Sequence, residues 1–93
     1  MRVLLALLVT MSAANAGPID DAMKKIGPAY MCGPPYAFDD ALTGLRNELR
    51  AAGLSDMLAS FTIDGLRAWV EKEHAKTRAK ITAAECKSKY NAD

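Results

Sequence analysis

The chain is poor in the side chains that most often perform chemistry. Its 93 residues include two cysteines, one histidine and one tryptophan. It has no P-loop, no G-x-S-x-G, no H-E-x-x-H and no EF-hand loop, which are common signatures of nucleotide, hydrolase, zinc-protease and calcium sites. A structural zinc site needs four ligands, more than the cysteines and the histidine supply. The sequence therefore predicts a protein that is not an enzyme and that binds no metal and no cofactor.

The chain also lacks a surplus of charge of either sign. Lys and Arg together number 12, and Asp and Glu together number 11. A nucleic-acid-binding domain is expected to carry a basic surplus, so we expect no nucleic-acid partner. The acidic doublets Asp20-Asp21 and Asp39-Asp40 fall near the starts of expected helices, where carboxylates interact favourably with the helix dipole. We expect this role for them, not that of a catalytic pair.

The longest apolar run is too short to span a membrane. Val3–Met11 is about half of the roughly 20 residues that a spanning helix needs. A basic residue precedes the run and the small residues Ala14-Asn15-Ala16 follow it, which is the order of a secretory signal peptide. We therefore expect residues 1–16 to be a cleavable signal peptide, with an uncleaved interfacial anchor as the alternative. The mature chain, residues 17–93, would be a single domain in the periplasm or outside the cell.

Two cysteines in a small exported chain are expected to pair with each other. Cys32 and Cys86 are too far apart in the sequence for a C-x-x-C motif, and no charged residue lies within six positions of Cys32 to activate its thiol. We predict a disulfide between them, with a free or intermolecular thiol as the alternative. Closing so long a loop should stabilise the fold by about 4 kcal/mol in the chain-entropy model.

No segment alternates with the two-residue period of a strand, and four segments are predicted as helices. These are Ile19–Ile26, Phe38–Ala52, Ile63–Ile81 and a last helix from Thr82 to Tyr90. The break near Lys80–Thr82 rests on the capping-box spacing of Thr82 and Glu85, and an unbroken helix over 63–90 is the alternative. The fold class is therefore all-α, a small bundle of two main antiparallel helices with short helices at either end and one long-range disulfide.

The predicted connections follow from proline, glycine and serine. Gly27-Pro28 is expected to end the first helix, and residues 30–38, which contain Pro34 and Pro35, are expected to form an extended connector. Gly53 is expected to end the second helix. Ser55 is expected to cap a brief separate turn, after which Thr62 begins the longest helix. The seam by which this helix faces the core is predicted to consist of Ile63, Leu66, Val70, Thr77 and Ile81.

Aromatic side chains supply the candidate partner surface, which consists of Tyr30, Tyr36, Trp69 and Tyr90. The three tyrosines and Phe38 are expected around the disulfide. Packing in the core is the simpler role for them, since so small a chain needs each of its large side chains there. Trp69 is expected on the flank of the long helix.

Two further features belong to the long helix. His74 lies near the core seam and is a candidate pH switch. Its burial would oppose protonation, and the fold would lose stability as the pH falls below about 6.5. The alternative is a histidine without function. Lys72, Lys76 and Lys80 form a basic row opposite the seam, which is typical of a solvated face. A membrane surface is not the expected partner, because Glu71 and Glu73 interrupt the row.

Two functions fit this description. The first is a non-enzymatic module that binds another protein or a cell-envelope component, such as an inhibitor, immunity protein, effector or adaptor. An exposed apolar patch would favour it, and a core this small also makes a homodimer compatible with the sequence. The second comes from a resemblance. With its signal peptide, small helical body and long-range disulfide, the chain resembles the periplasmic acid chaperones of enteric bacteria, which implies a stress-conditional chaperone. No arrangement of residues in the sequence supports a third class, a small hydrolase.

Overall fold

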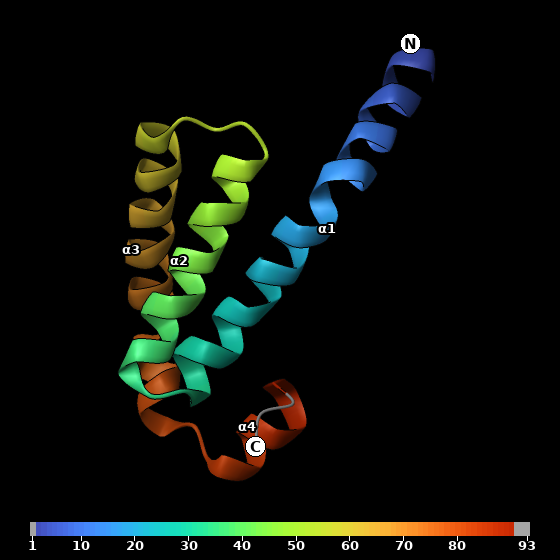
Figure 1. Ribbon diagram of the computed structural model, residues 1–93. Coiled ribbons are helices and arrows are strands. Elements are labelled where there is room, and N and C mark those ends of the chain that lie inside the picture. Colours follow the sequence, from blue (N-terminus) through green and yellow to red (C-terminus); the bar gives the residue numbers. More distant parts are fainter. Residues whose placement is uncertain (1, 91–93) are drawn as a thin grey trace.

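The computed structural model describes the backbone of residues 2–90 and the side chains of residues 17–90. The described backbone forms four helices and no strand, which confirms the all-α class (Figure 1): α1 (Arg2–Cys32), α2 (Pro35–Ala51), α3 (Asp56–Lys80) and α4 (Ala83–Tyr90). The predicted signal peptide, residues 1–16 with cleavage after Ala16, lies outside the residues whose side chains are described. It stays a prediction.

Helices α2 and α3 run antiparallel side by side, as the sequence predicted for the two main helices (Figure 1). α1 packs against α2, α3 and α4, and the core lies where α1, α2 and α3 meet. Its buried side chains are almost all aliphatic or aromatic: Ala22, Ile26, Tyr30, Met31, Phe38, Leu42, Leu45, Ile63 and Val70.

Helix α1 continues through Gly27-Pro28 to Cys32, so the prediction that it ends at Ile26 is wrong. A proline inside a helix removes a backbone hydrogen bond and costs about 3 kcal/mol. Ile26, Tyr30 and Met31 lie on both sides of Pro28 in the sequence, and each is less than a tenth exposed. Burying a large apolar side chain contributes about 1.5–3 kcal/mol. Burial on the two sides of the proline therefore offsets its cost and keeps the segment helical.

The predicted extended connector shrinks to a tight turn at Gly33 and Pro34. Pro34 is extended, with ψ of 163°, as expected for a residue that precedes another proline. A Cβ atom at Gly33 would lie 2.8 Å from the carbonyl oxygen of Ala29 and 2.8 Å from the Cβ of Ala37. α1 and α2 thus approach so closely at this turn that only glycine fits between them.

The loop between α2 and α3 is closed by Gly53 and Ser55. Gly53 has φ of 111°, the left-handed conformation that commonly ends a helix, which confirms its predicted role. The backbone N–H of Leu58 donates to the Ser55 hydroxyl at 3.2 Å, so Ser55 caps α3 itself and not a separate turn. Thr62 donates its hydroxyl to the Leu58 carbonyl at 2.8 Å inside that same helix. The prediction that Thr62 begins the long helix is therefore wrong, because nothing between Ser55 and Thr62 interrupts the helix.

Helix α3 faces the core through Ala59, Ile63 and Val70, with Leu66 half-buried between them. Thr77, which the sequence placed in this seam, is exposed. At this end of α3 the residue that meets α1 is Arg78, whose guanidinium carbon lies 5.1 Å from the centre of the Tyr30 ring, whereas Thr77 lies with Lys80 and Ile81 on the side toward α4 (Figure 1).

The break before α4 is confirmed. Ile81 is extended, with ψ of 140°, and the next residue, Thr82, forms the predicted capping box. The N–H of Glu85 donates to the Thr82 hydroxyl at 3.1 Å, and that hydroxyl donates to the Glu85 carboxylate at 3.2 Å. The chain therefore turns back and α4 lies beside α1.

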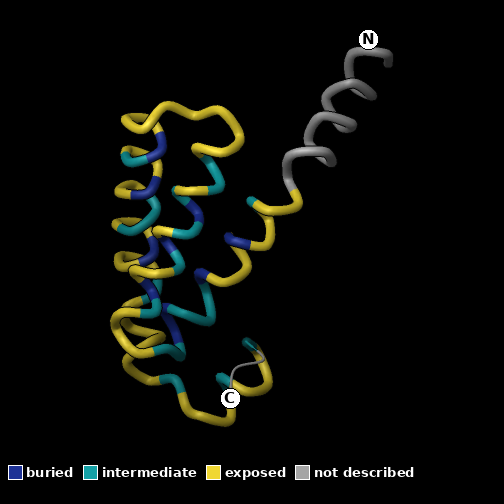
Figure 2. The backbone as a smooth tube through the Cα atoms, in the orientation of Figure 1, coloured by how far each residue is buried: buried dark blue, intermediate teal, exposed yellow. Residues whose placement is uncertain are grey.

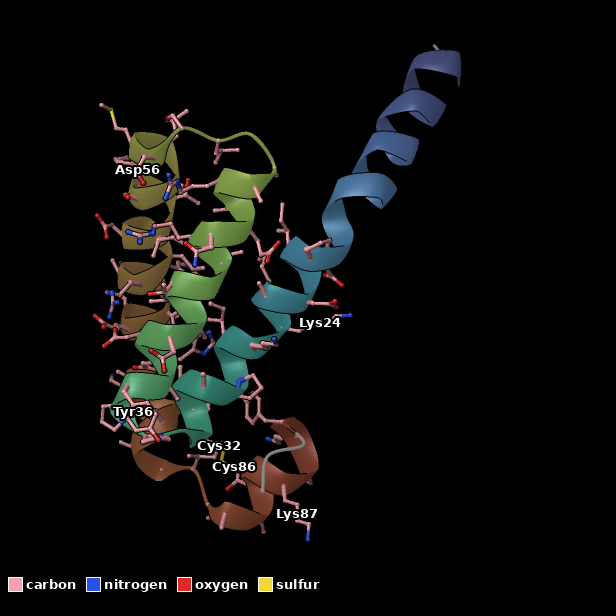
Figure 3. All side chains as sticks on the ribbon, in the orientation of Figure 1. Lys24, Cys32, Tyr36, Asp56, Cys86 and Lys87 are labelled. Atoms are coloured by element: carbon pink, nitrogen blue, oxygen red, sulfur yellow. A yellow bond between two sulfur atoms is a disulfide. The ribbon has the colours of Figure 1, made fainter. Side chains whose placement is uncertain are left out.

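The predicted disulfide between Cys32 and Cys86 is present and joins the last residue of α1 to the middle of α4 (Figure 3). The two Cα atoms lie 5.8 Å apart. Neither cysteine is free.

Candidate binding groove

An apolar groove of about 270 Å³ opens between α1, α3 and the end of α4. Five residues of α1 and four of α3 face each other across it, and Tyr90 closes one end. The lining residues are Met23, Ile26, Gly27, Tyr30, Met31, Leu66, Trp69, Val70, His74 and Tyr90.

Helix α1 supplies the floor and one rim of the groove. Ile26 and Tyr30 are one helical turn apart on its buried face, and their side chains are 6% and 5% exposed. The ring of Tyr30 packs edge-on against Phe38, with ring centres 4.7 Å apart. Tyr30 is thereby held in the core and presents only part of its surface to the groove. Met23, one turn earlier, is 52% exposed and forms the rim.

Helix α3 supplies the opposite wall through Leu66, Val70 and His74, which recur at spacings of four on its core side. Trp69 forms the rim on this side and is 55% exposed. Its ring packs edge-on against that of His74, with the centres 5.5 Å apart. The groove therefore has a buried aliphatic floor and two large half-exposed side chains, Met23 and Trp69, at its edges.

Helix α4 places Tyr90 at the end of the groove. Within the described chain, α4 approaches only α1 among the other helices, and none of its residues is buried. The Tyr90 ring lies directly over Gly27: its Cε1 atom is 3.7 Å from where a Cβ atom would be at that glycine. Gly27 thus gives the tyrosine room to lie against α1, and the disulfide at Cys86 keeps α4 within reach.

The groove carries no formal charge of its own, since no Asp, Glu, Lys or Arg is among its lining residues. Arg78 lies beside its floor, with its guanidinium carbon 5.1 Å from the centre of the Tyr30 ring. On α1, the hydrogen bond and charge of Asp20, at 2.9 Å, raise the pKa of Lys24, and this exposed pair lies outside the groove (Figure 3). The groove is therefore suited to an apolar group, and the polar side-chain atoms that line it belong to Tyr30, Trp69, His74 and Tyr90.

Most of the residues that the sequence singled out meet in this groove. Tyr30, Trp69 and Tyr90 line it, and so does His74. Tyr36 does not: it lies at the start of α2, is 67% exposed, and lies apart from the labelled Cys32 and Cys86 (Figure 3). The expectation that Tyr36 packs around the disulfide is therefore not met.

Sequence reasoning missed the contribution of α1. Met23, Ile26, Tyr30 and Met31 recur at spacings of three, four and one, which is the pattern of one helical face. The prediction that the helix ends at Gly27-Pro28 hid this pattern, because it placed Tyr30 and Met31 in an extended connector.

The described residues contain no cluster of three or more His, Cys, Asp or Glu side chains that could hold a metal ion. In the same part of the chain, no helix combines the length and the hydropathy needed to cross a membrane. Comparison of the whole chain with known protein families, with curated proteins and with solved structures gave no match in any of the three.

Proposed function

We propose that the protein is an exported, non-enzymatic binding module whose groove receives an apolar side chain of a partner protein in the cell envelope or outside the cell. The observation that carries this proposal is the pair of half-exposed residues, Met23 and Trp69, that flank a buried apolar floor. Trp, Tyr and Met are enriched in protein interfaces, and the residues that dominate binding insert into desolvated pockets.

The size and composition of the groove support a side chain as its occupant. Pockets for drug-sized ligands measure about 300–1,000 Å³, and this groove, at about 270 Å³, is smaller and open on one side. An open groove without charges favours an apolar anchor presented by a larger partner. The disulfide supports export, because such bonds persist mainly in oxidising compartments.

The test uses two matched variants, Met23→Glu and Tyr36→Glu. Each replaces an exposed apolar residue with a carboxylate, but only Met23 lines the groove. Each immobilised protein is exposed to envelope proteins of the producing organism, and the retained proteins are quantified by mass spectrometry. We expect a partner that the wild type and Tyr36→Glu retain and that Met23→Glu loses. A set of retained proteins that is the same for all three would refute the proposal.

A second candidate function, acid-stress chaperone, is favoured by the position of His74 in the groove. Its ring packs edge-on against Trp69, no carboxylate lines the groove beside it, and Arg78 follows one helical turn further along α3. This function requires suppression of client aggregation near pH 3 that is reduced by His74→Gln. Equal activity of the two proteins would refute the role of His74.

A further inference from the structure

Helix α3 has a second stripe, on the side that faces away from the core. We define the outer stripe as seven exposed residues at spacings of 3, 4, 4, 3, 4 and 4 along one side of the helix: Leu58, Phe61, Gly65, Trp69, Lys72, Lys76 and Lys80. Figure 2 shows this arrangement, since α3 is exposed along the side that faces away from α2 and buried on the side that faces α2. Trp69 borders both the outer stripe and the groove, whereas the other six belong to the outer stripe alone.

The N-terminal half of the outer stripe is apolar without contributing to the core. Leu58 is 57% exposed and Phe61 is 76% exposed, although both lie within a regular helix. Met57, beside them, is 80% exposed. Neighbouring exposed side chains of this size are typical of interaction sites on otherwise soluble domains. The fold does not explain them, because the core is completed by the other side of α3.

Gly65 lies in the middle of the outer stripe and inside α3, where glycine costs about 1 kcal/mol relative to alanine. A Cβ atom at this position would have no neighbour within 4 Å, so the fold does not require a glycine there. The missing side chain leaves a hollow between Phe61 and Trp69. Such a hollow allows a second helix to approach α3 closely.

The C-terminal half of the outer stripe is basic. Within residues 17–90, no carboxylate forms an ion pair with Lys72, Lys76 or Lys80. Lys76 lies three positions after Glu73, a spacing at which such pairs can form, but these two side chains are not among the ion pairs of the described residues. The positive charge of this half is thus available to a partner.

From this pattern we infer that the outer stripe binds an amphipathic helix of a partner protein whose acidic half lies on the lysines and whose apolar half lies on Leu58, Phe61 and the Gly65 hollow. The two helices run antiparallel, because acidic residues in the N-terminal half of the partner then also interact favourably with its own helix dipole. A helix fits better than an anionic membrane because the stripe is narrow. Asp64, Glu71 and Glu73 lie beside it and would repel lipid headgroups. This surface shares only Trp69 with the groove, so the inference does not rest on the proposed function.

The test uses two fluorescently labelled synthetic helical peptides, both with leucine and alanine in the C-terminal half. The first carries glutamates in its N-terminal half and the second carries lysines at the same positions. We expect the glutamate peptide to bind the oxidised protein at least about tenfold more tightly in fluorescence anisotropy. Binding should weaken as salt rises from about 50 to about 500 mM, since salt screens the lysines. Trp69, the only tryptophan, should shift its emission to the blue on binding.

Variants connect this binding to the outer stripe. Lys72→Glu with Lys76→Glu should reverse the preference between the two peptides, and Leu58→Glu should weaken both. Gly65→Gln fills the hollow and should reduce affinity about tenfold. Its matched control is Gly44→Gln in α2, where a Cβ atom also meets nothing within 4 Å. Met23→Glu, which alters only the groove, should leave peptide binding unchanged.

Three results would overturn the inference. One is that neither peptide binds. Another is equal affinity for the glutamate and lysine peptides. The third is that phosphatidylglycerol vesicles shift the emission of Trp69 and the glutamate peptide does not. If Lys72→Glu with Lys76→Glu abolished that shift, the outer stripe would be a membrane surface. None of them affects the groove, which is tested separately at Met23.

Discussion

The two ends of the bundle are held together by different means. At the end where α2 joins α3, noncovalent features suffice: Gly53 and Ser55 shape the loop, and the Arg50 guanidinium of α2 lies 3.5 Å from the Asp56 carboxylate of α3. At the other end, α4 has no buried residue, and the Cys32–Cys86 bond joins it to α1. The first end depends on packing and the second on a covalent bond.

This difference bears on function, because the groove belongs to the covalently held end. Tyr90 closes the groove only while α4 stays beside α1. The outer stripe, in contrast, lies on α3, whose place is set by the core residues Ile63 and Val70. The two proposed binding surfaces should therefore respond differently to loss of the disulfide and to loss of core packing.

The largest effect should come from removing the disulfide with Cys32→Ser and Cys86→Ser together. The bond joins residues 54 positions apart, and a loop of that length contributes about 4 kcal/mol in the chain-entropy model. A core of this size supplies about 5 kcal/mol or less. The variant, like the reduced wild type, should be largely unfolded at about 37 °C, where disulfide loss often abolishes folding of small secreted domains. Circular dichroism melts measure this, and a cooperative transition unaffected by reductant would contradict it.

A smaller effect is expected from Leu42→Ala, which opens a cavity in the packed end. Leu42 is only 1% exposed, and truncation of a buried leucine costs about 3 kcal/mol. The matched control is Leu58→Ala on the outer stripe, where the side chain is 57% exposed and the loss should be below about 0.5 kcal/mol. Urea titrations of the oxidised proteins give both values. Equal losses would show that Leu58 contributes to the core, contrary to its exposure.

The smallest effects should come from the two helix caps, Ser55→Ala and Thr82→Ala. Loss of a cap costs about 1 kcal/mol. Because α3 is part of the core, Ser55→Ala should lower the melting temperature of the whole protein. Thr82→Ala should mainly reduce hydrogen-exchange protection of the α4 amides, since that helix packs little and stays tethered when it frays. A drop in global stability as large for Thr82→Ala as for Ser55→Ala would show that α4 unfolds together with the bundle.

Local signals predicted much of the fold. The stripe through Phe38, Leu42 and Leu45 and the glycine at 53 located α2, and the capping box at Thr82 located the start of α4. Prediction failed where tertiary contacts overrode local preference. Pro28 stays within α1 because its neighbours are buried against α2 and α3. The helical spacing of Ile26, Tyr30 and Met31 is present in the sequence, but the stop signal of Gly27-Pro28 was given more weight.

The groove was partly predictable. Tyr30, Trp69, Tyr90 and His74 stood out because large or titratable side chains are scarce in this chain, and they do line one groove. Their convergence could not be derived from spacing, because it depends on the disulfide bringing α4 beside α1. The outer stripe was only half recognised: the lysine row was noted, but Leu58 and Phe61 were assigned to a separate turn and not to the same side of α3.

The central claim, that the groove is where the partner binds, is tested most directly by photo-crosslinking in cells that produce the protein. A benzoylphenylalanine is placed at position 23, on the rim of the groove, or at position 36, which is also exposed but lies outside it. The account predicts one discrete adduct to another protein from position 23 and none from position 36. No adduct at position 23, or the same adduct from both positions, would contradict it.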